Sequence, residues 1–270
     1  MKKRCIIVCL VLFGTYLYIN KKLDIQSQNT HITTGTKRYK NFSLDNVLSS
    51  RYGDIHYNAY IPKAYDKRQS YALYITLPGY QGLYFQGVGE NLKTEEFEFI
   101  SQKYNDHMII VAPQLEDWGE LSANKTIALT KYFLKHYAIN LKQVYISGYS
   151  GGGETLSLVL SKAPELYCRA LMCSSKWDGN FNKVVENKTP IYFVIGEEDE
   201  YYGSSPFKEA YQELVDLYKQ QGLSDEEIEK YVVLDVKNND YFLTQGIENQ
   251  HGQGGHLFSN DPQIMGWLFY

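Results

Sequence analysis

The sequence predicts an α/β fold in which a mostly parallel sheet is covered by helices on both faces. Short, continuously apolar runs alternate along the chain with longer segments whose apolar residues have helical spacing. Apolar runs of this kind are typical of strands buried on both faces, and the alternation with helices favours parallel pairing. With 270 residues, of which 44% are hydrophobic, the chain can build one large core.

The elements can be assigned in order along the chain. The expected strands are residues 55–62, 71–79, 107–113, 143–148, 168–175, 190–196 and 231–237. The expected helices are residues 94–105, 125–138, 153–167 and 207–222, and a last one that follows a cap at Asn260 or Asp261 and has Pro262 in its first turn. We therefore expect a single domain over residues 46–270, with no separate lid domain.

The N-terminal residues have the pattern of an export signal. Residues 1–22 begin with basic side chains, continue through an apolar run at residues 5–19 and end on two lysines. As a helix, 15 residues span about 22 Å, less than a membrane core of about 30 Å. We expect a signal peptide or a short signal anchor, followed by a polar linker over residues 23–45. The domain would then be extracellular or held at the outer face of the cytoplasmic membrane, with residues 5–19 as a possible tether.

The charge balance excludes one class of partner. The formal net charge is −4, and the three basic residues near the N-terminus leave 24 basic against 31 acidic side chains in the rest of the chain. A protein that binds nucleic acid needs a basic patch. We therefore expect no nucleic-acid partner.

A glycine-rich corner follows the expected strand at 143–148. The sequence "GYSGG" places Ser150 between that strand and the expected helix, with glycines at 148, 151 and 152. The pattern Gly-x-Ser-x-Gly in this context is typical of a nucleophile elbow, where a serine is exposed on a sharp turn. A tight packing turn is the alternative. In a mostly parallel sheet, chemistry gathers at the carboxyl ends of the strands, which is where Ser150 falls.

A serine nucleophile needs a base that is oriented by an acid. In chains with this elbow the acid follows the serine, and the histidine follows the acid. Asp199 lies three residues after Gly196 at the end of an expected strand, with Glu198 as the reserve. His256 is the preferred base, because it ends a glycine-containing stretch that we interpret as a loop before the last helix, and His251 is the alternative. A metal site at the two histidines is less consistent with known ligand spacings.

Two backbone N–H groups are expected to form an oxyanion hole. Gly151 follows the nucleophile directly, and Tyr80 lies in the turn "LPGYQG" after an early strand. Candidates for substrate contact are Gln81 in the same turn, Tyr149 beside the serine, and Trp118 in the loop at 112–125.

The sequence resembles the α/β-hydrolases, and more narrowly the secreted esterases allied to polyhydroxybutyrate depolymerases and feruloyl or acetylxylan esterases. The resemblance rests on residues 134–167, on "PIYFVIGEEDE" and on "GGHLF" with the later "WLF". The chain departs from that group in having "LPG" at residues 77–79 and a further glycine after the elbow.

The resemblance implies a serine hydrolase that cleaves a carboxylic ester through an acyl-enzyme on Ser150. His256 would act as base and then acid, Asp199 would hold the imidazolium, and neither a metal nor an organic cofactor would be required. The substrate would be a small-molecule or polymer-borne ester. One alternative is a serine peptidase similar to prolyl oligopeptidase, and another is an inactive hydrolase scaffold that serves as a surface binding module.

Overall fold

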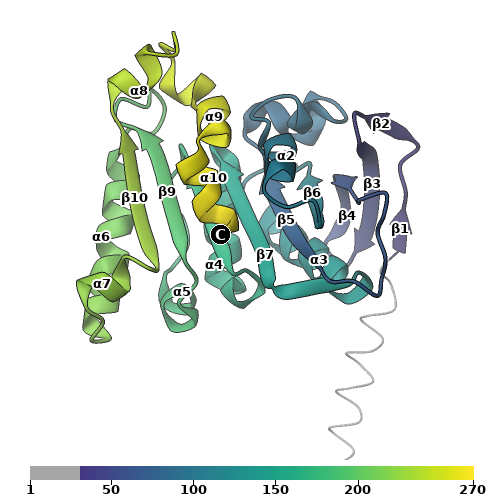
Figure 1. Ribbon diagram of the computed structural model, residues 1–270, viewed down its shortest axis with the longest axis horizontal. Helices are drawn as coiled ribbons and strands as arrows, with labels where there is room; N and C mark the ends of the chain where they lie inside the picture. The colour runs from purple at the N-terminus through teal and green to yellow at the C-terminus, as the bar shows by residue number, and fades with distance from the viewer. Residues whose placement is uncertain (1–30) are drawn as a thin grey trace, which may run out of the picture.

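The computed structural model describes residues 31–270, in which ten strands form one sheet (Figure 1). The strands are β1 (His31–Thr33), β2 (Lys37–Tyr39), β3 (Phe42–Ser50), β4 (Gly53–Tyr60), β5 (Tyr71–Leu77), β6 (Met108–Pro113), β7 (Ile139–Tyr149), β8 (Arg169–Cys173), β9 (Ile191–Gly196) and β10 (Val232–Lys237). The α-helices are α2 (Phe97–Ile100), α3 (Glu120–His136), α4 (Gly151–Lys162), α5 (Asn182–Asn187), α6 (Ser205–Gln220), α7 (Asp225–Ile228), α8 (Asn239–Leu243), α9 (Gln250–Asn260) and α10 (Pro262–Phe269).

The strand order places most of the sheet in parallel pairing. The order is β1-β3-β4-β6-β5-β7-β8-β9-β10, with β2 paired to β3. The pairs from β6 through β10 are parallel, whereas β1, β2, β3, β4 and the β4–β6 pair are antiparallel. The expected fold class, a mostly parallel sheet with helices on both faces, is confirmed.

Two hydrophobic cores lie on the two faces of this sheet. Along β5, Leu73 and Ile75 face the core shared with α3, α4 and α6, while Ala72 and Tyr74 face the core shared with α9 and α10. Figure 1 shows α9 and α10, in yellow, on the near side of the sheet and α3 and α4 on the far side. Because successive side chains of a strand point to opposite faces, a strand between two helical layers must be apolar throughout.

The first described strands differ from the sequence prediction. Residues 31–45 were expected to belong to a polar linker, but β1, β2 and the start of β3 lie within them. The nine residues of β3 alternate between buried and half-buried positions, with Phe42 and Leu48 in the two cores. Ser43 and Asp45 between them are half-buried and Asn46 is buried with hydrogen-bond partners, so the segment has a low average hydrophobicity although it is part of the sheet.

The export signal predicted over residues 1–22 lies outside the described residues. None of the helices within residues 31–270 is long and apolar enough to cross a membrane. Cys168 and Cys173 are free thiols, the first half-buried and the second buried. The cap predicted for the last helix is present, since Asp261 Oδ1 accepts hydrogen bonds from the N–H groups of Gln263 and Ile264.

Candidate active site

Ser150 occupies a sharp turn between β7 and α4. Its φ is 51° and its ψ is −125°, a conformation that residues with a side chain rarely adopt. Strain of this kind costs about 1–3 kcal/mol and is retained only where neighbouring contacts impose it. Here the Ser150 N–H donates to Cys173 O at 2.9 Å, and Ser175 Oγ donates to Ser150 O at 2.6 Å. The turn is therefore anchored to β8 and to the residues that follow it.

The glycines of the elbow are required by close packing. A Cβ on Gly148 would lie 2.5 Å from Gly152 O, and one on Gly152 would lie 2.4 Å from Leu77 O, at the end of β5. A Cβ on Gly151 would meet the Trp118 indole at 2.1 Å. The sequence interpretation of a strand, an elbow and a helix is thus correct in its local structure.

A chain of hydrogen bonds joins three side chains at the carboxyl end of the sheet. Ser150 Oγ lies 3.0 Å from His251 Nε2, and His251 Nδ1 lies 2.9 Å from Asp199 Oδ2. Ser150 follows β7, Asp199 follows β9, and His251 is in the first turn of α9. This is the mutual arrangement of nucleophile, base and acid that a catalytic triad requires.

His256, the preferred base from the sequence, does not lie at Ser150. Its Nδ1 atom is 3.1 Å from Glu96 Oε2, and 57% of its side chain is exposed. The glycine-containing segment is not a loop but helix α9, capped by Asn249, whose side chain accepts the Gly252 N–H. In a helix, five residues correspond to about 7.5 Å of rise and about 140° of rotation, so the two histidines point in different directions. The prediction of His256 at the site is wrong, and His251 takes that place.

Asp199 lies where the sequence placed it, with only 4% of its surface exposed. Burial acts to raise the pKa of this carboxyl, but hydrogen bonds from His251 and from the Tyr202 N–H outweigh burial and lower its pKa. The N–H groups of Tyr201 and Tyr202 donate to Asp199 Oδ1 at 3.1 and 2.8 Å. The reserve acid, Glu198, is exposed on the same turn. Asp199 is thus held as a carboxylate facing His251.

Glu200 positions the start of α9, a role that the sequence analysis did not predict. Its two carboxylate oxygens accept the backbone N–H groups of Gln250 and His251 at 2.9 and 2.8 Å. Gly196 contributes to the same junction, since a Cβ there would lie 2.1 Å from Gln250 Oε1. A carboxylate directly before an exposed tyrosine carries no signal of this role in the sequence, because its partner is a helix that the sequence did not predict.

Tyr149, a predicted substrate contact, is buried instead, with 6% of its surface exposed. Its hydroxyl donates to His251 O, and its ring centroid lies 6.0 Å from that of His251. A buried side chain that contacts both the backbone and the ring of His251 is not available to a substrate. The prediction of substrate contact for Tyr149 is therefore corrected.

The turn after β5 borders Ser150 on the side away from Asp199. A Cβ on Gly79 would lie 3.4 Å from Ser150 Cβ, which brings the neighbouring Tyr80 backbone close to the nucleophile. Gly151 is the first residue of α4, where a helix has N–H groups without intrahelical partners. Tyr80 and Gln81 are exposed in the short 3₁₀ helix η1 (Tyr80–Gly82). The two predicted oxyanion-hole residues thus flank the serine.

Exposed aromatic rings surround this end of the sheet. The Tyr80 ring lies 5.6 Å from Phe85 and 6.1 Å from the half-buried Trp118, and the Tyr201 ring, 72% exposed, lies 5.1 Å from His251. Trp118 Nε1 is buried and has no hydrogen-bond partner among residues 31–270. Trp118 therefore remains beside the serine as the sequence analysis placed it, with Tyr80 next to it.

Two buried carboxyl groups lie near the site, Glu95 on the segment that leads into α2 and Glu98 within α2. Burial raises the pKa of Glu95 to about 7 and that of Glu98 to about 8. Glu98 Oε2 is buried and has no hydrogen-bond partner in the described part of the chain. Both groups are thus bound to protons in the native state at a pH where the unfolded chain has released them.

The pH dependence of stability follows from the raised pKa of Glu98. The stability that protonated Glu98 contributes to the folded state is fully present below 4.5, the pKa of this group in the unfolded chain. It is lost as the pH rises to about 8, the pKa of Glu98 in the folded protein. We expect Glu98→Gln to gain stability relative to the wild type between pH 5 and 8, by about 2–4 kcal/mol. Denaturant unfolding at several pH values measures this, with the exposed Glu213→Gln as the control. If the free energy of unfolding changed with pH in the same way in Glu98→Gln and in the wild type, the expectation would be refuted.

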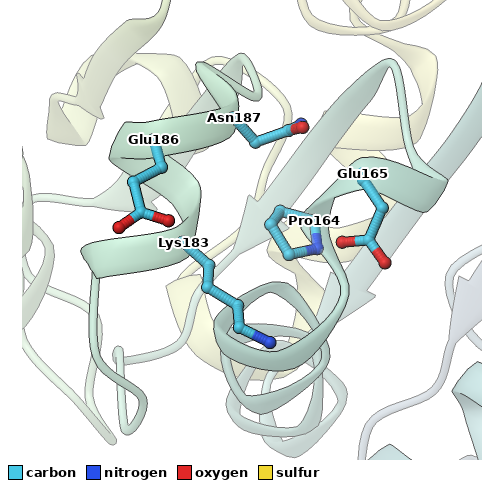
Figure 2. Close-up of a pocket in the computed structure, with 5 residues that line it drawn as sticks. All are labelled: Pro164, Glu165, Lys183, Glu186 and Asn187. Carbon is cyan, nitrogen blue, oxygen red and sulfur yellow. The ribbon is translucent and has the colours of Figure 1, made fainter. Parts of the chain in front are cut away.

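Figure 2 shows a hollow in the surface of the protein. It has a volume of about 430 Å³ and is lined by Pro164, Glu165, Lys183, Glu186 and Asn187. These residues precede β8 and β9, so the hollow is at the amino ends of the strands, whereas Ser150 follows the carboxyl end of β7. We assign the candidate site to the hydrogen-bonded side chains and not to this hollow.

Comparison with known proteins gives matches at the level of structure only. No protein-family model matches the sequence, and no curated protein is similar to it. A thermostable esterase matches with a TM-score of 0.66 at 18% identity, over 85% of this chain and 62% of that one. An acetyl xylan esterase from Aspergillus awamori matches with a TM-score of 0.57 at 11% identity, over 83% of this chain and 99% of that one.

A peptidase is also similar in structure. Oligopeptidase B from Leishmania major matches with a TM-score of 0.54 at 11% identity, over 84% of this chain and 37% of that one. The chain thus spans less than two thirds of the thermostable esterase and little more than a third of the peptidase. With these likenesses and the sheet order described above, the chain has the α/β-hydrolase fold, as the motifs predicted.

Proposed function

We propose that this protein is a serine hydrolase that cleaves a carboxylic ester through an acyl-enzyme on Ser150. The observation that carries the proposal is the hydrogen-bonded series from Ser150 Oγ through the His251 ring to Asp199, with distances of 3.0 and 2.9 Å. The strained turn at Ser150 supports it, because strain is retained at functional sites.

The proposed reaction has two halves. Ser150 Oγ attacks the ester carbonyl while its proton passes to His251 Nε2, and the Asp199 carboxylate stabilises the imidazolium through Nδ1. The tetrahedral intermediate collapses as His251 gives the proton to the departing alcohol. Water, whose proton passes to His251 Nε2, then attacks the acyl-enzyme. The bond to Ser150 Oγ breaks as His251 returns the proton to that oxygen, and the acid is released. Ser150, His251 and Asp199 are the three side chains that take part in these steps.

The carbonyl oxygen needs donors as it becomes negative. We propose the backbone N–H groups of Gly151 and Tyr80 for this role, because the first begins α4 and the second lies in the turn beside Ser150. Trp118 and Gln81 would contact the substrate from the same side. The exposed ring of Tyr80 would extend this surface toward a small-molecule or polymer-borne ester.

A fluorophosphonate probe tests the proposal directly, since it reacts covalently with an activated serine. The wild type should be labelled, and Ser150→Ala should not be. Ser70→Ala, in an exposed loop, is the matched control and should be labelled like the wild type. A folded wild type that never reacts would favour the alternative of an inactive scaffold acting as a binding module.

A serine peptidase is the second candidate, and the likeness to oligopeptidase B favours it. The two reactions share nucleophile, base and acid, so the site geometry does not separate them. Short p-nitrophenyl esters and peptide anilides should be compared as substrates by kcat/KM. We expect the esters to be preferred, and a higher kcat/KM for the anilides would replace the esterase by the peptidase.

We also propose that the protein is exported, from the pattern of residues 1–22. The domain would then be extracellular or tethered at the outer face of the cytoplasmic membrane. N-terminal sequencing of protein from cells and from medium distinguishes the two. A soluble form that begins beyond residue 20 would exclude the tether, and a full-length form confined to the cytosol would exclude export.

A further inference from the structure

The segment that carries Tyr80 is attached to the rest of the protein at few points. Between β5 and α2 it forms the 3₁₀ helices η1 (Tyr80–Gly82), η2 (Tyr84–Gln86) and η3 (Glu90–Leu92). Leu83 and Leu92 are buried, whereas Tyr80 is 51% exposed. Among the described residues, a single backbone hydrogen bond leaves residues 78–94, from the Tyr84 N–H to Leu115 O at 2.9 Å. The backbone around Tyr80 therefore needs further partners to keep one position.

Gln114, the residue after β6, supplies those partners from inside the protein. Its Oε1 atom accepts the Gly89 N–H at 2.9 Å, and its Nε2 atom donates to Gly87 O at 2.9 Å and to Gly82 O at 3.4 Å. All three partners belong to the segment that carries Tyr80, and Gly82 is the last residue of η1. One side-chain amide thus binds the backbone on both sides of η2.

Two further buried amides complete this cluster. Asn58 Nδ2 donates to Asn91 Oδ1 at 2.7 Å and to Gln114 Oε1 at 3.4 Å. Asn91 Nδ2 donates in turn to Ala112 O in β6 at 3.1 Å. None of the three amide residues has more than 3% of its surface exposed. The two donors and two acceptor sites of the Gln114 amide are all used, so its orientation is fixed.

The 3₁₀ helix η1 packs directly against the same cluster. A Cβ on Gly82 would lie 2.8 Å from Asn91 Cβ and 2.5 Å from Pro78 Cβ. The Gly82 N–H donates to Gly79 O at 3.1 Å, which closes a tight turn around Tyr80. Any displacement of Gly82 would therefore also displace the backbone N–H of Tyr80.

We propose that Gln114, supported by Asn58 and Asn91, positions the Tyr80 N–H in the oxyanion hole. This inference rests on the proposed serine hydrolase function. A donor stabilises the developing negative charge best when it is already fixed before the reaction, because no reorganisation is then needed. Gln114 acts through the segment and not on the substrate, so it is a positioning residue and not a catalytic one.

The test compares a p-nitrophenyl ester with the corresponding thionoester, in which sulfur replaces the carbonyl oxygen. Sulfur is a larger atom and a weaker hydrogen-bond acceptor, so donors in the oxyanion hole favour the oxygen ester. Partial unfolding or damage to the Ser150–His251–Asp199 series would lower both rates by the same factor. A displaced Tyr80 N–H would instead lower the ratio of kcat/KM for the oxygen ester to kcat/KM for the thionoester.

Gln114→Met keeps the length of the side chain and removes its hydrogen bonds to the segment. We expect kcat on the oxygen ester to fall at least about 10-fold, with KM changed by less than about 2-fold, since complete loss of an oxyanion donor costs about 10²–10³-fold. The rate on the thionoester should fall by less than about 3-fold, so the ratio should decrease. Gln114→Glu keeps an acceptor for the Gly89 N–H but loses at least one donor, and should lie between Gln114→Met and the wild type.

Asn46→Leu is the matched control, because Asn46 is a buried amide of β3 that does not bind the segment. Its side chain is hydrogen-bonded to Ser43 Oγ at 2.9 Å and to Tyr57 O at 3.2 Å. We expect Asn46→Leu to unfold at a lower urea concentration than the wild type, as Gln114→Met should. The ratio of the two kcat/KM values should nevertheless stay at its wild-type value in Asn46→Leu.

The outcomes separate this inference from the proposed function. If the wild type hydrolyses neither ester, the hydrolase proposal fails and the inference falls with it. If the wild type is active but the ratio is the same in Gln114→Met, the amide cluster has only a structural role and the inference is wrong. Should Gln114→Met not fold, Gln114→Glu provides the same comparison, and a wild-type ratio in that variant would overturn the inference. An active wild type without preference for the oxygen ester would also overturn it, because no donor would then need positioning.

Discussion

His251→Ala is expected to lower kcat on a p-nitrophenyl ester by at least about three orders of magnitude, with the fold retained. The His251 ring is the only side chain that joins Ser150 to Asp199 within the described residues, with Nε2 3.0 Å from the serine and Nδ1 2.9 Å from the carboxylate. Without it no base receives the serine proton. Steady-state kinetics and circular dichroism of the variant measure the two parts of this expectation.

His256→Ala is the matched control for that experiment, because it removes the same side chain five residues along the same helix. The His256 ring pairs with Glu96, and both side chains are well exposed, so little depends on the contact. We expect kcat to change by less than about 3-fold, as is usual for exposed positions. Equal losses in both variants would indicate damage to α9, and a larger loss in His256→Ala would remove His251 from the proposed role.

The positions of the candidate nucleophile and acid could be predicted from the sequence because each follows a strand that the sequence shows clearly. Ser150 and Asp199 come directly after apolar runs, now β7 and β9, and the carboxyl ends of parallel strands meet at one edge of the sheet. Local patterns suffice for such residues, since strand and turn are encoded within a few positions.

The position of the proposed base was mispredicted because it depends on tertiary contacts. The segment "QHGQGGH" contains three glycines, which weaken a helix, so a loop was the natural interpretation. The structure forms α9 there because Gly255 packs closely over Glu95 and Tyr149, and because the Glu200 carboxylate binds the first N–H groups of the helix. No short-range pattern contains those partners, which lie 50 or more residues away.

The edge of the sheet was missed for a related reason. β1, β2 and β3 pair with antiparallel neighbours and include many polar side chains, most of them exposed or half-buried. Only the pairing of β3 with β4, and of β1 and β2 with β3, reveals them as strands. The predicted N-terminal boundary of the domain at residue 46 thus falls within β3 and not at its beginning.

Gly148→Ala is the second substitution for which we expect a large effect. The added Cβ would lie 2.5 Å from Gly152 O, 2.6 Å from Gly152 C and 2.8 Å from Gly153 N, all of them backbone atoms of the first turn of α4. Backbone in a packed helix cannot yield as a flexible side chain does, so the start of α4 must shift. We expect a loss of about 2–3 kcal/mol in the free energy of unfolding, at the upper end for overpacked sites.

The same shift should reduce reactivity, because α4 carries the Gly151 N–H and Ser150 is its N-cap residue. Labelling of Gly148→Ala by a fluorophosphonate should slow at least about 10-fold, as a small misplacement of reacting groups can cost still more. Gly266→Ala is the control: a Cβ there meets nothing within 4 Å in the interior of α10. It should stabilise the protein by about 0.5–1 kcal/mol and leave labelling unchanged. If Gly148→Ala were as stable as the wild type and were labelled at the same rate, the elbow would not be packed as described.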